Sequence, residues 1–233
     1  MRTSIYPILI GMTRCYILAG ESAILVDGGM PALPSQPEPG QRFQDQLRRL
    51  PVRPDEIKLM LITHAHFDHI GAVQSIQNLT GAKIALHSRD KERLDQNAMP
   101  LPPGVTLWGR TTITMLTRVV PRLKIPPFKT DLALGDEELS LAEYGIEGKV
   151  VYTPGHTSGS TSVLLDTGDA FVGDLAMNAF PLRLTPGLPI FAENLSQVKE
   201  SWRKMLDLGA KTVYPAHGKP FSIEVIRKTL ALQ

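Results

Sequence analysis

Cysteine is nearly absent from this chain of 233 residues, which contains Cys15 and no second thiol. One thiol cannot form an intramolecular disulfide, and it cannot supply the several thiolates of a cysteine-rich metal cluster. Because few cysteines are typical of proteins in a reducing compartment, we expect a cytoplasmic location.

Long apolar runs are also lacking. No stretch approaches the roughly eighteen uninterrupted apolar residues that a membrane-spanning helix needs. The chain starts with MRTSIYPILIGMTRCYILAG, an apolar stretch that Pro7 and Arg14 interrupt, and this pattern favours two strands over a signal peptide. We therefore expect no membrane partner.

An excess of one charge sign is lacking as well. Lys and Arg number 25 against 23 Asp and Glu, for a formal net charge of +2, and this balance does not indicate a nucleic-acid partner. Hydrophobic residues at 42% and charged residues at 21% are typical of a globular domain. We expect a single domain over residues 1–233, as a monomer or a homodimer.

Short β-rich runs that end in Gly, Pro or Asp alternate with helical patterns along the chain. The strand-like runs are TRCYILAG, SAILVDGG, KLMLITH, AKIALHS, GKVVYTPGH, TSVLLD, AFVGD and KTVYPAHG. The helical patterns cover residues 41–50, 69–79, 193–209 and 222–233. Asn194 or Ser196 is the expected cap of the third helix. Strands in two groups with helices outside predict an α/β protein of layered sheets.

Two segments do not fit this alternation. Residues 96–131 combine six prolines with apolar and basic residues, and residues 176–192 are similar. Because long connections inside a compact domain are usually functional, we expect both to be lid or insert segments at an active site, with a dimer contact as the alternative. We expect the basic residues to be solvated on a lid helix, with recognition of an anionic substrate as the alternative. These residues are Arg110, Arg118, Arg122 and Lys124.

The segment LITHAHFDHIGA, residues 61–72, concentrates ligand-type side chains directly after a predicted strand. His64 begins the turn, His66 follows two residues on, and Asp68 and His69 open the next helix. Imidazoles and a carboxylate at this density repel one another or leave buried polar groups unpaired unless a cation satisfies them. Adjacent Asp68 and His69 point in different directions, which favours two metal ions over one.

Three further strands end in the same way. His156 follows GKVVYTPG, Asp174 follows AFVG, and His217 follows KTVYPA, each beside a Gly or Pro that lets the backbone turn sharply. Together with the cluster at 64–69 they make seven donors, enough for three per ion with one carboxylate shared and a position open to water. A lone histidine after a strand is usually a turn residue, but seven such donors favour a metal centre.

Two other residues of this kind are harder to place. His87, in ALHS, has no other candidate ligand beside it in the sequence, and we expect it at the surface or behind the ligands. Asp27, in LVDGG, either orients a histidine by accepting a hydrogen bond or forms an Asp-Gly turn, and the sequence favours neither.

The motifs THAHFDH, TPGHTSGS, FVGD and YPAHG, in this order, resemble those of the metallo-β-lactamase superfamily, and the resemblance extends from Ile24 to Gly218. It implies an αβ/βα four-layer sandwich, with two β-sheets face to face and helices outside. It also implies two ligand sets with one shared residue. These are His64, His66 and His156 for the first metal, Asp68, His69 and His217 for the second, and Asp174 as the bridge.

Within the superfamily, the sequence looks most like the small dinuclear hydrolases, which include glyoxalase II, lactonases and unassigned broad-specificity enzymes. True β-lactamases usually lack a bridging carboxylate where this chain has Asp174, which argues against antibiotic hydrolysis. We therefore expect two divalent metal ions, with Zn²⁺ favoured over Fe, Mn or Co. A metal-bridging hydroxide would attack the ester, lactone or thioester carbonyl of a small-molecule substrate. Asp68 and Asp174 are the expected catalytic residues, because either could relay the proton to the leaving group.

The sequence is also compatible with other functions. One is a mononuclear iron oxidoreductase similar to persulfide dioxygenases, in which His64, His66 and either Asp174 or His156 hold a single iron. The complete second donor set weighs against it. Another is a hydrolase that acts on phosphoesters or β-lactams. A non-catalytic structural zinc site fits least, because such sites are closed and often rich in cysteine.

Overall fold

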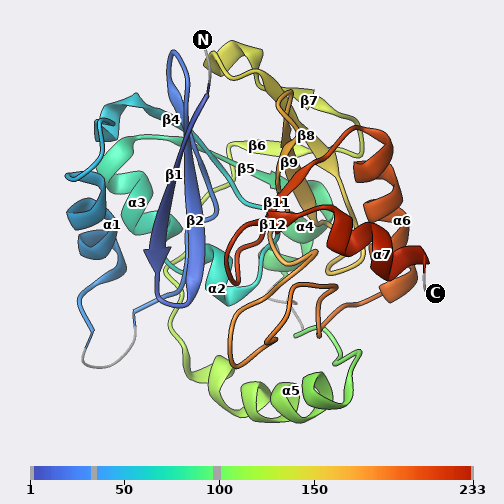
Figure 1. The fold of residues 1–233 in the computed structure, drawn as a ribbon. Helices are drawn as coiled ribbons and strands as arrows, with labels where there is room; N and C mark the ends of the chain where they lie inside the picture. Colours follow the sequence, from blue (N-terminus) through green and yellow to red (C-terminus); the bar gives the residue numbers. More distant parts are fainter. Residues whose placement is uncertain (1–2, 33–35, 97–100, 232–233) are drawn as a thin grey trace.

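Two β-sheets lie face to face in the computed structural model, which describes residues 3–32, 36–96 and 101–231 (Figure 1). The first sheet has six strands in the spatial order β1 (Ser4–Ile10), β2 (Thr13–Ala19), β3 (Ala23–Val26), β4 (Ile57–Leu61), β5 (Lys83–His87) and β6 (Leu132–Leu134). β1 to β3 pair antiparallel, and β3 to β6 are parallel. The carboxyl ends of β3, β4 and β5 therefore meet at one edge of this sheet.

The second sheet is mixed and also has six strands in the described part of the chain. Their spatial order is β12 (Phe221–Ser222), β11 (Thr212–Tyr214), β10 (Asp169–Phe171), β9 (Thr161–Leu165), β8 (Gly148–Tyr152) and β7 (Leu139–Ser140). β10 pairs parallel with β11, and β9 lies antiparallel between β8 and β10. β8, β10 and β11 therefore run in the same direction and end at the same edge.

Helices cover the outer faces of both sheets. Those beside the first sheet are α1 (Pro39–Leu47), the short α2 (Phe67–Ile70), α3 (Val73–Thr80) and α4 (Ser88–Asp95), and those beside the second are α6 (Leu195–Asp207) and α7 (Glu224–Ala231). Short 3-10 helices span Pro54–Glu56, Val120–Arg122 and Ala142–Tyr144. The remaining helix, α5 (Leu107–Val119), lies apart from these layers, below the end of the sandwich (Figure 1).

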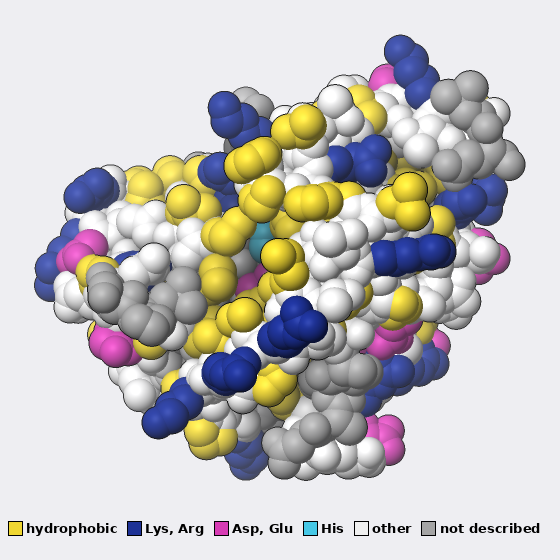
Figure 2. Space-filling model, turned by 90° about the horizontal axis from the view of Figure 1, so that it is seen from below, with side chains coloured by type: hydrophobic (Ala, Val, Ile, Leu, Met, Phe, Trp, Pro, Cys, Tyr) yellow, Lys and Arg dark blue, Asp and Glu magenta, His cyan; other side chains and the backbone are white. Residues whose placement is uncertain are grey.

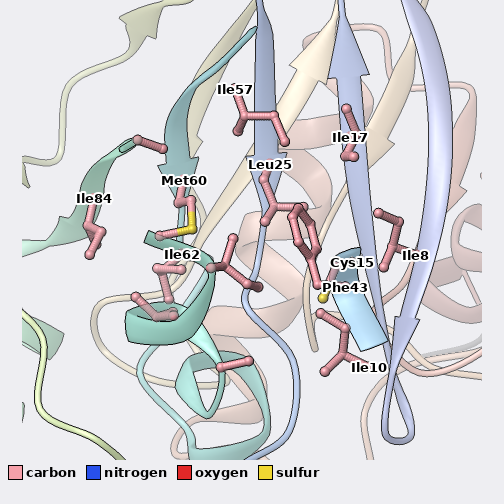
Figure 3. Close-up of a cluster of buried hydrophobic side chains, with 14 of the residues drawn as sticks. Ile8, Ile10, Cys15, Ile17, Leu25, Phe43, Ile57, Met60, Ile62 and Ile84 are labelled. Carbon is pink, nitrogen blue, oxygen red and sulfur yellow. The ribbon is translucent and has the colours of Figure 1, made fainter. Parts of the chain in front are cut away.

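Three apolar clusters hold the layers together. The cluster between the sheets joins Leu18 and Leu59 of the first sheet to Val163 and Phe171 of the second. A second cluster packs α1 and α3 on the first sheet, and Figure 3 shows the ring of Phe43 among side chains of β1 to β4. The third packs α6 and α7 on the second sheet. This arrangement confirms the predicted α/β class with four layers.

The predicted strands are all present, whereas the helix predicted over 69–79 is divided. The division falls at Gly71 and Ala72, between α2 and α3. The His69 carbonyl accepts a hydrogen bond from Gly28 N at 2.7 Å, and Gly71 N donates to the Gly29 carbonyl at 2.8 Å. A Cβ at Gly71 would lie 2.0 Å from Pro31 N. Contacts with the turn after β3 therefore replace continuous helical hydrogen bonding here.

The proline-rich insert 96–131 contains α5, which the sequence analysis did not delimit, and residues 97–100 of this insert lie outside the described residues. Asn194 caps α6, because its side-chain oxygen accepts hydrogen bonds from Ser196 N and Gln197 N. In the described residues, none of the helices combines the length and the apolar character needed to cross a bilayer.

The two tryptophans offer a matched test of the packing. Trp202 of α6 is fully buried and donates a hydrogen bond to the Leu175 carbonyl at 3.0 Å, whereas Trp108 of α5 is 50% exposed. We expect Trp202→Ala to lower the free energy of unfolding by about 3–5 kcal/mol, because it leaves a cavity and an unpaired carbonyl. Trp108→Ala should cost less than about 1 kcal/mol. Urea denaturation followed by far-ultraviolet circular dichroism measures both, and equal losses would contradict this assignment of the core.

Candidate metal centre

Seven histidine and aspartate side chains converge where the ligand-bearing strands of both sheets end. They are His64, His66, Asp68, His69, His156, Asp174 and His217, and all are buried except Asp68, which is half-buried. Four come from the connection between β4 and α2 and from α2 itself. The other three follow β8, β10 and β11. The seven residues that the sequence singled out therefore lie together, although 153 positions separate the first from the last.

The first donor group consists of His64, His66 and His156, whose ligand atoms lie within 4.8 Å of one another. Nδ1 of His66 lies 3.0 Å from Nε2 of His156, and their rings are almost perpendicular, at 84°. The three rings come from both sheets, because His156 lies in the turn after β8 and the other two lie in the turn after β4.

The second group consists of Asp68, His69 and His217. Oδ2 of Asp68 lies 3.1 Å from Nε2 of His217. Asp174 lies between the two groups: its Oδ1 is 3.4 Å from Nε2 of both His69 and His217, and its Oδ2 is 3.6 Å from Nε2 of His156. The two oxygens of one carboxylate thus face different groups, and one oxygen also lies within reach of a third set, His64, His69 and Asp174.

Several polar atoms of the cluster have no hydrogen-bond partner within the described residues. They are Nε2 of His64, His66 and His69, and Oδ1 of Asp174. A buried polar atom without a partner costs about 1–3 kcal/mol, and one native structure tolerates few of them. Imidazole nitrogens and a carboxylate oxygen that face one another are the donors that zinc and similar cations prefer. The residues present therefore fit divalent metal ions.

The protonation states agree with this fit for the first group. Burial and the neighbouring imidazoles lower the pKa of His64 well below its ordinary value, and they lower the pKa of His66 to about 3. Burial also lowers the pKa of His156. These rings are therefore neutral near pH 7 and present the lone pairs that a metal ion needs.

The second group is ionic. Burial by itself would lower the pKa of both histidines. Asp27 and Asp174 outweigh burial at His69 and raise its pKa. Asp174 and Asp68 likewise raise the pKa of His217 to about 8. Burial by itself would raise the pKa of the two aspartates, but His217 and His69 lower the pKa of Asp174 and of Asp68. Without metal, protons on the two histidines balance the carboxylates. Metal binding would displace these protons, because the ligand form of imidazole is neutral.

Asp27 holds His69 from behind. Its Oδ2 lies 2.9 Å from Nδ1 of His69, and its Oδ1 accepts hydrogen bonds from the backbone N and the hydroxyl of Thr63 at 2.8 and 2.9 Å. Asp27 also has a φ of 65°, which the turn before Gly28 requires. Of the two alternatives for this residue, the contact with Nδ1 supports the carboxylate that orients a histidine.

Backbone carbonyls orient two other histidines. Nδ1 of His156 lies 2.9 Å from the Phe191 carbonyl, and Nδ1 of His217 lies 3.4 Å from the Met12 carbonyl. In each case the outer nitrogen has a partner, so Nε2 faces the cluster. Glycine at position 173 lets the backbone before Asp174 pass close to the Thr63 side chain. Its φ is +51°, and a Cβ there would lie 2.4 Å from Oγ1 of Thr63.

Asp90, at the start of α4, is a functional residue that the sequence analysis missed. It is fully buried and accepts hydrogen bonds from Ala65 N at 3.0 Å, Thr157 Oγ1 at 2.9 Å and Gly159 N at 3.0 Å. It therefore ties the turn that carries His64 and His66 to the turn that carries His156. The signal available in the sequence was its place just after the strand AKIALHS, like the acidic residues that follow other strands.

His87 lies outside the cluster and is buried, so the expectation of a surface position is wrong. Its ring stacks on Tyr152 with centroids 4.6 Å apart, and Nε2 lies 3.2 Å from Oδ1 of Asp136. Nδ1 accepts a hydrogen bond from Arg89 N and caps α4. His87 thus fills space between the sheets and fixes the helix that carries Asp90.

A cavity of about 280 Å³ opens beside the cluster. His66, Asp68, Asp174 and His217 reach its inner end. Its remaining walls are mostly apolar and include Met12, Met30, Phe67, Ile113, Leu116, Val119, Pro181, Leu182 and Phe191. Figure 2 shows the mouth as a hollow ringed by hydrophobic side chains, with a histidine and an acidic group at its base. Both inserts, 96–131 and 176–192, contribute to these walls.

Comparisons with known proteins agree with this geometry. A family model of the metallo-beta-lactamase superfamily matches residues 9–217. A beta-lactamase-like protein 2 homolog of Drosophila melanogaster is 28% identical over 208 residues, which cover 88% of this chain and 58% of that protein. The probable metallo-hydrolase YflN of Bacillus subtilis is 25% identical over 222 residues, which cover 90% of this chain and 80% of the relative.

The chain is also similar, over a shorter stretch, to a hydroxyacylglutathione hydrolase of Maricaulis maris. The two are 29% identical over 66% of this chain and 46% of that enzyme. Among solved structures, a metallo-beta-lactamase family protein from Thermus thermophilus has a TM-score of 0.68 at 20% identity. That match covers 99% of this chain and 78% of the other, and it shows the same fold. With the family model spanning all seven donors, the chain belongs to the metallo-beta-lactamase superfamily.

Proposed function

We propose that this protein is a dinuclear metal-dependent hydrolase of uncharged esters, lactones or thioesters. The observation that carries the proposal is a cluster with buried donor atoms that lack hydrogen-bond partners among the described residues, two members of which, His66 and Asp174, also line an apolar cavity. Two relatives support hydrolysis, since one is named a probable metallo-hydrolase and the other a hydroxyacylglutathione hydrolase.

In this proposal each donor group holds one divalent ion, with Zn²⁺ favoured. The first ion would be held by His64, His66 and His156, and the second by Asp68, His69 and His217. Asp174 would be shared, which is supported by the different directions in which its two oxygens point. Metal ions bound there supply Lewis acidity and lower the pKa of coordinated water to about 7, which provides a nucleophile at neutral pH.

The protein's own groups would perform the proton transfers. Asp68 and Asp174 both border the cavity, so both can contact a bound substrate. Asp68 is the more exposed of the two, and its hydrogen bond to His217 keeps it ionised. We assign to Asp68, ionised at the start, the acceptance of a proton from the attacking water and its transfer to the leaving group, and to Asp174 the positioning of the reacting centre.

The cavity walls narrow the substrate class. Neither Lys nor Arg borders the cavity among the described residues, and Arg110, Arg118, Arg122 and Lys124 are exposed instead. This supports the expectation that these four are solvated and does not support recognition of an anionic substrate by them. An uncharged acyl group of small to medium size fits walls of Ile, Leu, Val and Phe. We propose that both inserts act as lids that exclude water from this group.

A substrate panel tests the function directly. On protein of known metal content, we expect hydrolysis of short and medium-chain aryl esters, lactones and thioesters, at rates above those for phosphotriesters and β-lactams, because the walls above the donors are apolar and include neither Lys nor Arg. Metal analysis should find about two ions per chain. Rates confined to phosphotriesters or to β-lactams would overturn the substrate class. A single redox-active iron with oxygen consumption would instead indicate the persulfide dioxygenase-like alternative.

Asp174→Asn tests the shared ligand. The amide keeps the shape of the side chain but removes its charge, so we expect loss of at least one ion per chain and a fall in kcat/KM of at least about 100-fold. Asp166→Asn, at an exposed position after β9, is the matched control and should change neither quantity. Plasma mass spectrometry and steady-state kinetics give both readouts. An Asp174→Asn enzyme with full activity and full metal content would refute the assignment.

Asp27→Asn tests the support behind His69. Asparagine tolerates a positive φ, so the turn should persist while the charge that orients the imidazole is lost. We expect the metal affinity of the second group to weaken by about 10–100-fold, measured by competition with a chromogenic chelator. Thermal unfolding of the metal-free protein serves as the control for folding. Unchanged affinity would show that His69 is held in place by packing alone.

A further inference from the structure

The two inserts form a surface that the proposed chemistry does not use. We call it the lid face and define it as the exposed residues of 101–130 and 176–192. Figure 2 looks onto this side of the molecule, where hydrophobic and basic side chains surround the cavity mouth. α5 supplies much of it, at the end of the sandwich farthest from the amino ends of β4 and β5 (Figure 1).

The charge of these segments is one-sided. Residues 101–130 and 176–192 contain six basic residues and no acidic residue, and Asp131 directly follows the first range. The small net charge of +2 for the whole chain therefore conceals a positive lid face and a negative remainder. Five of the six are exposed, and none of these five forms a salt bridge with another described residue. They are Arg110, Arg118, Arg122, Lys124 and Lys129.

Large apolar side chains project from the same surface. Leu107 and Leu184 are each 82% exposed and Phe180 is 78% exposed, and Trp108, Met115 and Val119 are at least half exposed. Isolated exposed apolar residues are ordinary, but a group gathered on one face marks an interaction site. On α5, Leu107, Met115 and Arg118 lie on the outward side, while Ile113 and Leu116 line the cavity. The helix thus carries apolar residues on both sides. Among the exposed ones, Trp108 donates a hydrogen bond from Nε1 to the Pro181 carbonyl at 2.8 Å, which joins the two segments of the lid face.

The charge selects among possible occupants. A second copy of the chain in a symmetric dimer would place two positive surfaces against each other. A nucleic acid would satisfy the charge but would gain little from Leu107, Phe180 and Leu184. An anionic lipid surface satisfies both features, because basic residues attract the headgroups while Trp, Phe and Leu enter the boundary between headgroups and acyl chains.

We propose that the lid face docks on an anionic bilayer surface, so that the cavity mouth faces the lipid. This differs from the sequence-based expectation of no membrane partner, which rested on membrane-spanning segments and net charge and not on the distribution of charge. Docking is independent of the proposed function. The consequence that apolar substrates enter from the bilayer rests on that function.

Vesicle flotation of the full, metal-loaded chain tests the docking. We expect binding to vesicles of phosphatidylcholine mixed with phosphatidylserine, little binding to phosphatidylcholine alone, and release as salt is raised. The double variant Arg118→Glu/Arg122→Glu should bind at least about tenfold more weakly. Lys58→Glu/Lys83→Glu, at the amino ends of β4 and β5, makes the same charge change at the opposite edge and should bind like the parent. Trp108→Ala should also weaken binding without unfolding the protein.

Hydrolysis of a short, water-soluble ester separates the two proposals, because neither Arg118 nor Arg122 borders the cavity. The double variant should keep this activity while it loses vesicle binding. Absence of binding to the mixed vesicles, or equal loss in the control variant, would overturn the docking. It would also be overturned if light scattering showed a dimer that Arg118→Glu/Arg122→Glu disrupts, or if the parent bound DNA and not vesicles.

Discussion

The structure depends on holding several imidazoles and carboxylates together in a buried place where they cannot satisfy one another. Three Nε2 atoms and one carboxylate oxygen of the cluster are buried without hydrogen-bond partners among the described residues. An arrangement of this kind costs free energy unless a cation occupies it, so the surrounding protein must hold it against collapse. Asp27 and the carbonyls of Met12 and Phe191 contact the outward Nδ1 atoms of three histidines. Asp90 instead holds the turns that carry the ligands.

The sandwich makes this possible because each sheet supplies part of the centre. In the second sheet, β8, β10 and β11 run in the same direction, so the turns that carry His156, Asp174 and His217 gather at one edge, where they meet the segment after β4. The apolar cluster between the sheets fixes the distance between the two sets of turns, and Asp90 links them directly at the edge. Packing of the layers thereby stabilises the fold enough to offset the cost of burying this group of polar atoms.

Around this rigid end, the inserts serve a different purpose. α5 and residues 176–192 place aliphatic and aromatic walls above the polar donors, which creates a cavity with charge at its base and apolar sides. The same segments turn basic and apolar side chains outward. One helix therefore shapes both the cavity and the surface around its mouth, and substrate access and surface contact are physically connected in this protein.

The sequence by itself predicted the seven candidate donors, the strands that precede them and the layered fold, because these depend on local pattern: an apolar run followed within a few residues by His or Asp. It could not determine what depends on distant neighbours. Burial of His87, the link made by Asp90 and the break at Gly71 arise from contacts with other strands and turns. The outward direction of Arg118 and the inward direction of Leu116 were likewise decided by where α5 packs. Only the tertiary structure brings these partners together, since their contacts join segments far apart along the chain.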